Sequence, residues 1–348
     1  MAGRVYLDWN ATAPLRPEAR AAMLEAMDLV GNPSSVHAEG RAARALVERC
    51  RERIRAALGA GAADLVFTSG ATEAAALALA GADAECAPVE HDAVRAWCRE
   101  TLSCDRDGRV QVADPARTAL QRANSETGVL QELPEGLWCV DFVQAVGKLP
   151  VAFDWTGARL GLVSAHKFGG PKGVGALLVA PGTDLEPLLR GGGQELGRRS
   201  GTENVIGIAG FAAALEAALA DLERGVWEEV RQMRDALEAR LRDAVPDLII
   251  AGEGAERLPN TSCLVVPGWK GETQVMQMDL AGFAVSAGSA CSSGKVRRSR
   301  VLEAMGLDGE AAASAIRVSL GPTTRREELE RFADAWTSAW RRRKARAA

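Results

Sequence analysis

A single cysteine stands among small residues near the C-terminal end, where the chain reads AVSAGSACSSGKV. A structural cysteine is usually packed among larger apolar side chains. Cys291 is instead surrounded by Ser, Gly and Ala, which supply little packing and leave the backbone free to move. This composition predicts a mobile, solvent-reachable loop that carries a thiol. The alternative at this point is a linker that happens to contain a cysteine.

A lysine with nucleophilic potential lies in the stretch SAHKFGGPKG, directly after an apolar run. A lysine at a strand end can be desolvated, which lowers its pKa and makes the amine a nucleophile toward carbonyls. Holding pyridoxal phosphate is the commonest use of such a lysine. Lys167 therefore fits a cofactor site, although position alone is equally compatible with a strand-end lysine that points to solvent.

The stretch FTSGATEAA ends a predicted strand and begins a predicted helix at Ala71. The free backbone N–H groups and the positive dipole end of a helix favour a phosphate, and the Thr72 hydroxyl can add a donor. Thr72 could equally be a helix N-cap.

An acidic residue follows the apolar run in VDFVQAVGKLP. A carboxylate there is costly without a cationic partner, and a pyridinium nitrogen is such a partner for Asp141. Gln144, three residues further on, can reach the same ring.

Two of the three histidines, His91 and His166, fall at the C-terminal ends of predicted strands. Open α/β sheets hold their ligands at that edge, although satisfied core histidines are the usual alternative. Arg317 lies inside the strand-like run AIRVSLG and needs an anion. A substrate carboxylate held by two hydrogen bonds and an internal salt bridge both meet that need.

The elements that must position these residues alternate between helix and strand over the first two-thirds of the chain. Helices are predicted over 35–59, 71–81, 207–223 and 227–245, and strands over 64–70, 85–91, 137–144, 159–167 and 173–182. This order predicts a mostly parallel α/β sheet. After about residue 246, strands over 248–254, 261–268 and 315–321 and a helix from about Arg325 indicate a smaller α+β domain. We therefore predict domains at 1–245 and 246–348, with the first ~15 residues packing with the small domain.

Bulk composition narrows the class of protein. The 348 residues carry a net charge of −4, which gives no general attraction to nucleic acid or anionic membranes. The basic ending WRRRKARAA is interpreted as a solvated helix end. Seven cysteines without a C-x-x-C pattern argue against a disulfide framework or a zinc site and for a reducing compartment. No leader-like or membrane-spanning apolar run is expected, so we predict a cytoplasmic protein.

Taken together and in order, these motifs resemble the pyridoxal-phosphate-dependent cysteine desulfurases of the iron–sulfur-assembly and nitrogen-fixation branch. The resemblance covers nearly the whole chain, from YLDWNATAP through GNPSSVH, NSETGVLQ and GGGQELGRRSGTENV to SAGSACSSG and IRVSLG. It implies an aspartate-aminotransferase-like α/β fold, a homodimer and a reaction that converts L-cysteine to L-alanine.

The resemblance also implies roles for individual residues. Lys167 would hold the cofactor and Cys291 would take the sulfur as a persulfide, with His91 over the ring as acid–base helper. Cofactor contacts are implied for Ala71, Thr72, Ser125, Asp141, Gln144, Ser164, His166 and Thr202, the last from the second subunit. Substrate contacts are implied for Arg317, Asn10 and Asn32. A sulfur-acceptor or iron–sulfur scaffold protein would be the partner.

Three departures from the family pattern stand out. Ser125 replaces the second Asn of the usual Asn-Asn-Glu, which puts its contact in doubt. The segments between His91 and Asn124 and between Gly128 and Asp141 are short, so this is a compact version. The stretch GKVRRSRVL is unusually basic and could face an acidic acceptor protein.

Rival interpretations are other enzymes and a non-catalytic homologue. A selenocysteine lyase or a small-substrate aminotransferase would share the fold, but an aminotransferase has no use for Cys291. A scaffold protein that lost turnover through Ser125 would not need to keep Lys167, Asp141 and Cys291.

Overall fold

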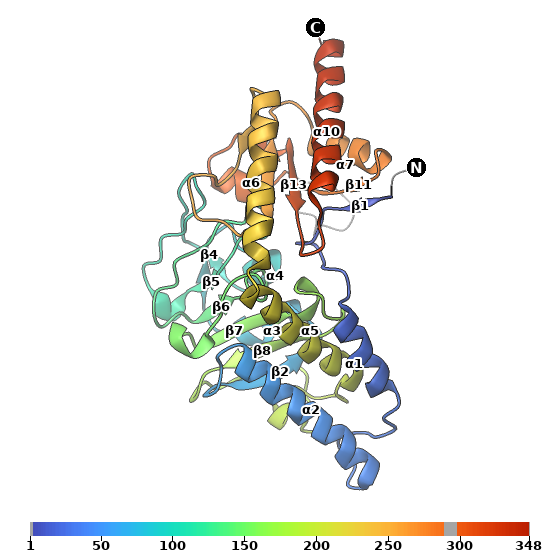
Figure 1. Ribbon diagram of the computed structural model, residues 1–348. Helices are drawn as coiled ribbons and strands as arrows, with labels where there is room; N and C mark the ends of the chain where they lie inside the picture. The colour runs from blue at the N-terminus through green and yellow to red at the C-terminus, as the bar shows by residue number, and fades with distance from the viewer. Residues whose placement is uncertain (1–2, 289–297, 348) are drawn as a thin grey trace.

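The computed structural model describes residues 3–288 and 298–347, which form two cores stacked one above the other (Figure 1). Residue Cys291 lies outside the described residues, as do Ser289 and the basic positions up to Arg297. The lower body holds the larger sheet, and the long helices α6 and α10 dominate the upper body.

The central sheet has five strands in the order β2-β8-β7-β6-β5. Their bounds are Asp64–Thr68, Gly175–Val179, Leu160–Ser164, Cys139–Asp141 and Ala119–Gln121. Strand β8 is antiparallel to both neighbours, and the other four strands run in one direction. The predicted α/β class with a mostly parallel sheet is thus confirmed, and strands β5, β6 and β7 end at one edge.

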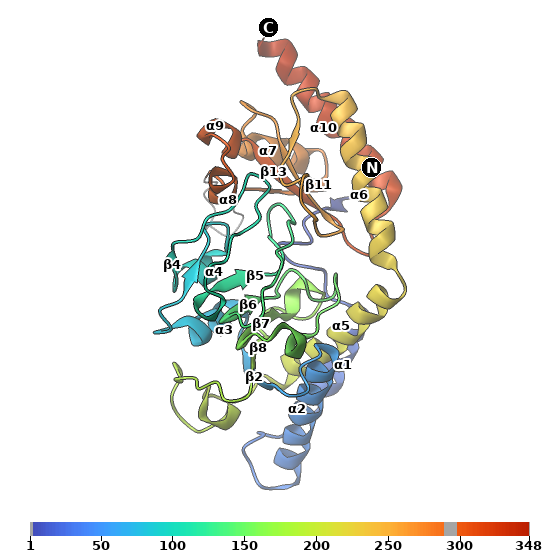
Figure 2. The ribbon, with the colours of Figure 1, turned by 90° about the vertical axis from the view of Figure 1, so that its left-hand side faces the viewer.

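Helices cover both faces of this sheet (Figure 2). On one face lie α1 (Pro17–Met27), α2 (Ala38–Ala57) and α5 (Val205–Glu223), and on the other lie α3 (Ala71–Leu79) and α4 (Asp92–Arg95). Helix α2 buries the stripe Ala43, Val47, Cys50 and Ile54, because residues three and four apart share one helix face.

Helix α5 bears on our expectation that no apolar run is long enough to span a membrane. Among the described residues it is the one helix that is long and apolar enough to cross a membrane by length and composition alone. Its side chains Phe211, Ala214, Leu215 and Ala218 are buried in the first core, as in the core helix of a globular domain.

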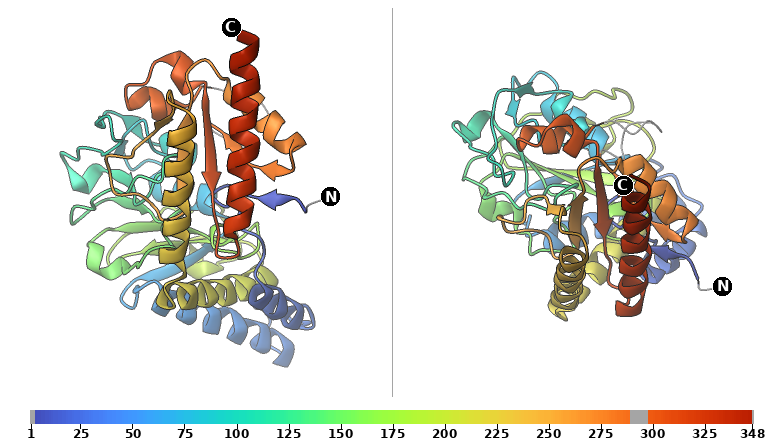
Figure 3. Two further views of the ribbon diagram at one scale, coloured as in Figure 1. Left: turned by 45° about the horizontal axis from the view of Figure 1, so that its top comes forward. Right: turned by 90° about the horizontal axis from the view of Figure 1, so that it is seen from above.

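The second core is built on a four-stranded antiparallel sheet in the order β12-β13-β10-β9. These strands span Ser286–Ala287, Ala315–Ser319, Thr261–Val265 and Ile249–Ile250. Figure 3 shows α6 and α10 side by side beside β13. The helices of this core are α6 (Val226–Ala244), α7 (Gly271–Leu280) and α10 (Arg326–Ala347). The short helices α8 (Arg300–Ala304) and α9 (Gly309–Ala312) pack in a separate cluster with Cys263 and Val265 of β10.

The N-terminal segment packs with the second core. Strand β1 (Val5–Tyr6) pairs in parallel with β11 (Phe283–Ala284), and Val5 and Leu7 are buried there. Side chains of α6 join the same cluster. The division into two domains at residue 246 stays a prediction.

One predicted strand is much shorter than expected. Strand β3 spans only Glu85–Cys86, where it pairs with β4 (Arg99–Glu100), and the chain then turns. Pro88 lacks the N–H that a longer ladder would need, and Glu90 N–H donates to Ala87 O at 3.1 Å. The prediction that His91 ends a strand is therefore wrong, and His91 instead caps helix α4.

Candidate active site

A cavity of about 860 Å³ lies where the carboxyl ends of β6 and β7 face the N-terminal segment and strand β13. Most of the residues singled out in the sequence line it: Asn10, Ala71, Thr72, His91, Ser125, Asp141, Gln144, Ser164, His166, Lys167 and Arg317. The structure thus brings together side chains that lie up to about 300 residues apart in sequence.

One end of the cavity is formed by the start of helix α3. Gly70 precedes the helix with φ of +155°, and a Cβ on Gly175 would lie 2.7 Å from Gly70 Cα, so two backbones meet here without side chains. Thr72 and Ser164 bring their hydroxyls to this end. It offers helix N–H groups and hydroxyls, the donor set that suits a phosphate.

A charged residue beside this end is fixed by an ion pair. Glu73 accepts from Arg199 Nε at 2.8 Å and from Ser69 N–H at 2.6 Å. Partial burial raises the pKa of Glu73, but these hydrogen bonds outweigh it and hold that pKa below its usual value. The start of α3 is thereby tied to the segment that carries Arg199.

Asp141 and His91 face the middle of the cavity. Asp141 Oδ1 accepts from Val143 N–H at 2.8 Å. Burial raises the pKa of Asp141, while the Val143 N–H and the nearby His91 and Lys167 act in the opposite direction. A cation in the cavity would therefore be stabilised by this carboxyl group.

The surroundings of the two histidines indicate the tautomer of His91 and the charge of His166. Ala93 N–H donates to His91 Nδ1 at 3.1 Å, so a neutral His91 ring carries its proton on Nε2. His166 Nδ1 lies 3.2 Å from Thr12 Oγ1. Burial, followed by the charges of Lys167 and Lys172, lowers the pKa of His166 to about 4, so it is neutral near pH 7.

Lys167 follows β7 in a short 3-10 helix, Ala165–Lys167. Its Nζ donates to the backbone oxygens of Asn10 at 2.8 Å and Ala11 at 3.0 Å. The lysine therefore reaches across the cavity to the N-terminal segment, within the cluster that contains Asp141 and His91.

Arg317 has a partner that the sequence did not reveal. Its Nη2 lies 2.8 Å from Asp8 Oδ1, and its Nη1 donates to Ser125 O at 3.0 Å. The buried Nε of Arg317 has no hydrogen-bond partner among the residues that the structure describes. The internal salt bridge is thus present, and capture of a substrate carboxylate stays a prediction.

Ser125 contributes through its main chain. Its backbone oxygen accepts from Arg317 and from Asn10 Nδ2, the latter at 3.2 Å. Asn10 is buried and also bonds Thr261 Oγ1 at 2.8 Å and Ser319 Oγ at 3.0 Å. Asn10 therefore joins the large sheet to the second core.

Three residues at or beside the cavity were missed in the sequence, and of these Trp97 lines it. Lys148 is buried beside Gln144, and a lysine between apolar neighbours in AVGKLP was the available signal. Glu90 is buried with Oε2 unpartnered among the described residues, and burial raises its pKa well above its usual value. Trp97 lines the cavity with 44% of its surface exposed, and nothing in the residues around it indicated a role in the site.

Two predicted site residues do not line the cavity of a single chain. Asn32 is exposed, and its Oδ1 accepts from Ser34 N–H at 2.9 Å. Thr202 is exposed after the glycine-rich segment. That segment is fixed upstream by Glu195, whose carboxylate pairs with Arg51 at 2.8 Å.

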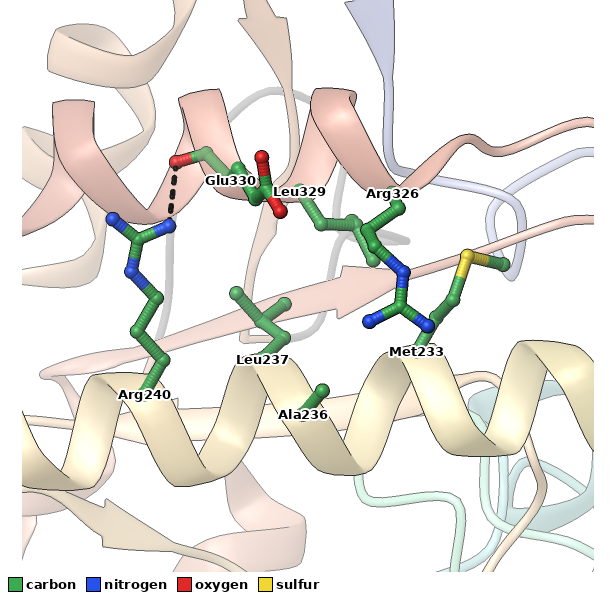
Figure 4. Close-up of a pocket in the computed structure, with 7 residues that line it drawn as sticks. All are labelled: Met233, Ala236, Leu237, Arg240, Arg326, Leu329 and Glu330. Atoms are coloured by element: carbon green, nitrogen blue, oxygen red, sulfur yellow. Dashed lines mark hydrogen bonds between the residues drawn. The ribbon is translucent and has the colours of Figure 1, made fainter.

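A second cavity, of about 130 Å³, lies between α6 and α10 (Figure 4). Its wall combines aliphatic side chains with the charged residues Arg240, Arg326 and Glu330, and Arg240 donates to the backbone oxygen of Glu330 at 3.4 Å. The grouping of amine, imidazole and carboxyl found in the large cavity is missing from these lining residues, so the large cavity is the candidate active site.

Comparisons with known proteins find matches along most of the chain. The model of the class-V aminotransferase family matches residues 5–95 and 112–332. A cysteine desulfurase of Cereibacter sphaeroides is 40% identical over 366 residues, which cover 94% of each chain. The cysteine desulfurase IscS of Dictyoglomus turgidum is 37% identical over 94% of this chain and 92% of its own.

Among solved structures, the X-ray structure of a NifS-like protein from Rickettsia africae superposes with a TM-score of 0.87 at 30% identity. The superposition covers 97% of this chain and 99% of that one. The residues that the family comparison leaves unmatched, 96–111, include Trp97 and fall between His91 and Asn124, in the segment that the sequence predicts to be short.

Proposed function

The chain belongs to the class-V aminotransferase family, and on that premise we propose that it is a cysteine desulfurase, which takes sulfur from L-cysteine and releases L-alanine. The observation that carries this proposal is the cavity that places Lys167, Asp141 and His91 together beside the start of helix α3. Cysteine desulfurases at 40% and 37% identity over nearly the whole chain support it.

The residues present fit pyridoxal phosphate, on which this family depends. Lys167 would hold it covalently, and the start of α3 with Thr72 and Ser164 would hold its phosphate. Asp141, whose pKa is raised by burial, would pair with the protonated ring nitrogen as a cationic partner. His91 would lie over the ring, and Gln144 would donate to its phenolic oxygen.

The chain's own groups then divide the work on the substrate. The bound cofactor supplies an electron sink that makes the α-proton of cysteine easier to remove. Lys167 Nζ would move that proton, and His91, with its proton on Nε2, would assist as acid and base. Arg317 and Asn10, which is held by hydrogen bonds to both cores, would orient the substrate carboxylate.

The sulfur step needs a second nucleophile, and we assign it to Cys291, which lies outside the described residues. Its thiolate would attack the substrate sulfur and break the bond from that sulfur to the β-carbon. The enzyme then carries a persulfide, Cys–S–SH, and the former β-carbon takes a proton to give alanine. No external oxidant is required, because the electron pair of the broken S–C bond stays with the β-carbon, whose reduction balances the oxidation of the sulfur.

A second copy of the chain would complete the site. Thr202 is exposed and stays outside the cavity of its own chain, so we propose that Thr202 of the partner subunit reaches the phosphate. We further propose a cytoplasmic homodimer that acts on neither nucleic acid nor membranes. It would pass its sulfur to an acceptor or scaffold protein for iron–sulfur cluster assembly or another thio-cofactor.

The test is to measure sulfide and alanine released from L-cysteine by the purified protein with pyridoxal phosphate and a thiol reductant. We expect the two products in equal amounts. A keto acid in place of alanine would indicate an aminotransferase. Turnover confined to selenocysteine would indicate a selenocysteine lyase, and no turnover by cofactor-loaded protein would indicate a scaffold.

A further inference from the structure

Lys148 is a buried lysine that the proposed chemistry does not use. It is 3% exposed, and its Nζ donates to two oxygens of one residue, Gln144 O at 3.1 Å and Gln144 Oε1 at 2.8 Å. Neither acceptor is charged, and the described residues offer Lys148 no carboxylate partner. A buried lysine with such partners needs a physical explanation.

The hydrogen-bond count matches a neutral amine. An –NH₂ group has two donors, and both are used by the two oxygens of Gln144, whereas an ammonium would leave a third donor unsatisfied. Burial, followed by the charges of Lys167 and Arg317, lowers the pKa of Lys148 well below its usual value, in agreement with that count. Lys148 therefore acts as a pair of fixed donors.

These donors decide which way the Gln144 amide is turned. Its Oε1 accepts from Lys148, and its Nε2 donates to Asn10 O at 3.0 Å. If the amide were rotated by half a turn, Nε2 would face the Lys148 donors and Oε1 would face the Asn10 oxygen. The hydrogen bond from Lys148 to Oε1 would be lost and two oxygens would be brought together at Asn10, so the observed orientation is the one that satisfies both partners.

We propose that Lys148 is a positioning residue that makes Gln144 present an N–H, and never a carbonyl, to the cavity. Nε2 has two hydrogens, and Asn10 uses one of them, so the second is available to an oxygen acceptor in the cavity that Gln144 lines. This inference rests on the proposed function, in which the acceptor is the phenolic oxygen of pyridoxal phosphate. Lys148 would thus act on the cofactor through Gln144 without touching it.

The experiment compares Lys148→Met, Gln144→Leu and the double variant in the full-length protein. Pyridoxal phosphate is titrated into each apoprotein, and the absorbance of the loaded protein is followed against pH. We expect Lys148→Met to raise the dissociation constant roughly fivefold to tenfold. We expect the pKa of the absorbance change to shift upward, because the phenolic oxygen loses a reliable donor.

The double variant separates positioning from general damage. If Lys148 acts through Gln144, adding Lys148→Met to Gln144→Leu should change neither quantity further. Leu149→Ala is the matched control, because the neighbouring part-buried Leu149 packs near Leu258 and its aliphatic side chain has no group that could hydrogen-bond Gln144. It should lower thermal stability while leaving the absorbance pKa in place.

Several results would overturn the inference. One is a Lys148→Met protein whose affinity for pyridoxal phosphate and absorbance pKa equal those of the wild type. Another is a Lys148→Met change that weakens cofactor binding as much in the Gln144→Leu background as it does in the wild type. If Lys148→Met does not fold, NMR of the wild-type protein labelled at its glutamine amides provides the test. The Gln144 NH₂ resonances should move when pyridoxal phosphate binds, and resonances that do not move would reject the proposal. Failure of wild-type protein to bind the cofactor would instead reject the proposed function.

Discussion

The two walls of the cavity are built in different ways. On the large-sheet wall, Asp141 ends β6, Lys167 follows β7 and Thr72 lies at the start of α3, so each group is placed by the element next to it. On the opposite wall, Arg317 of β13 is held by Asp8, 309 residues away in sequence. Local structure therefore places the groups proposed to hold the cofactor, whereas contact between the two cores places the groups proposed to bind the substrate.

This difference separates two kinds of defect. Changes on the large-sheet wall should act on cofactor binding and leave the second core unaffected. Changes on the opposite wall should act on the substrate and on the connection between the cores, because Asn10 bonds both Ser125 O and Thr261 Oγ1.

The largest effect is expected from Lys167→Ala on the large-sheet wall. Loss of the amine should abolish the absorbance band of covalently held pyridoxal phosphate and lower turnover by at least roughly 10³-fold. Absorbance and sulfide release report the two losses. Lys270→Ala, an exposed lysine before α7, is the control and should behave as wild type. A Lys167→Ala protein with a normal band and normal turnover would show that the assignment is wrong.

Cys291→Ser should separate the sulfur step from cofactor chemistry. A serine hydroxyl cannot carry sulfane sulfur, so sulfide release should fall roughly 10²-fold or more. The spectral change on adding L-cysteine should persist, because the large-sheet wall is intact. Mass spectrometry should find no persulfide on the variant. Cys104→Ser, in which the part-exposed thiol bonds Ala304 O at 3.4 Å, is the matched control. Normal desulfuration by Cys291→Ser would remove Cys291 from the mechanism.

The opposite wall is tested by Arg317→Gln and Asp8→Asn. Loss of the guanidinium should raise the KM for L-cysteine roughly 30-fold, as expected for a charged hydrogen bond. Asp8→Asn should raise it less, roughly threefold to tenfold, because Arg317 is still present but less firmly held. Steady-state kinetics measures both. A lower KM in Asp8→Asn would mean that Asp8 competes with the substrate instead of positioning Arg317.

The smallest effect is a pH dependence of stability in the apoprotein. His166 has a pKa of about 4 in the folded chain against 6.5 in its unperturbed state, so below pH 6.5 the unfolded chain binds more protons. The stability that the neutral His166 side chain gives to the folded apoprotein is fully present above pH 6.5 and is lost as the pH falls toward 4. Thermal unfolding at pH 5 and pH 7 should show wild type losing roughly 2–4 °C more than His166→Gln. Equal losses in both proteins would contradict the lowered pKa.

Much of the large-sheet wall could be predicted from the sequence. Helical periodicity located α2, and the apolar runs located β2, β7 and β8, because side-chain spacing reflects short-range geometry. Lys167 and Asp141 follow such runs, and parallel strands bring their ends to one edge of the sheet. The family motifs added a role for each residue.

Other features could not be predicted in this way. The reversed direction of β8 and the early end of β3 depend on which strands pair, and apolar runs do not specify direction. Glu90 and Lys148 looked like ordinary charged residues, since only packing shows that both are buried. His91 was placed at a strand end, although it caps α4.

The sequence by itself determined which chemical groups are present and which local elements carry them, because propensity and periodicity act over a few residues. Only the tertiary structure decided that Asp8 meets Arg317, that Asn10 joins the two cores and that a buried Lys148 bonds the Gln144 amide. The first two contacts join segments that are distant in sequence, whereas Lys148 and Gln144 are four residues apart and become buried only on packing. Burying charged and polar groups costs free energy, and that cost is offset by hydrogen bonds that are stronger in the low-dielectric interior than in water.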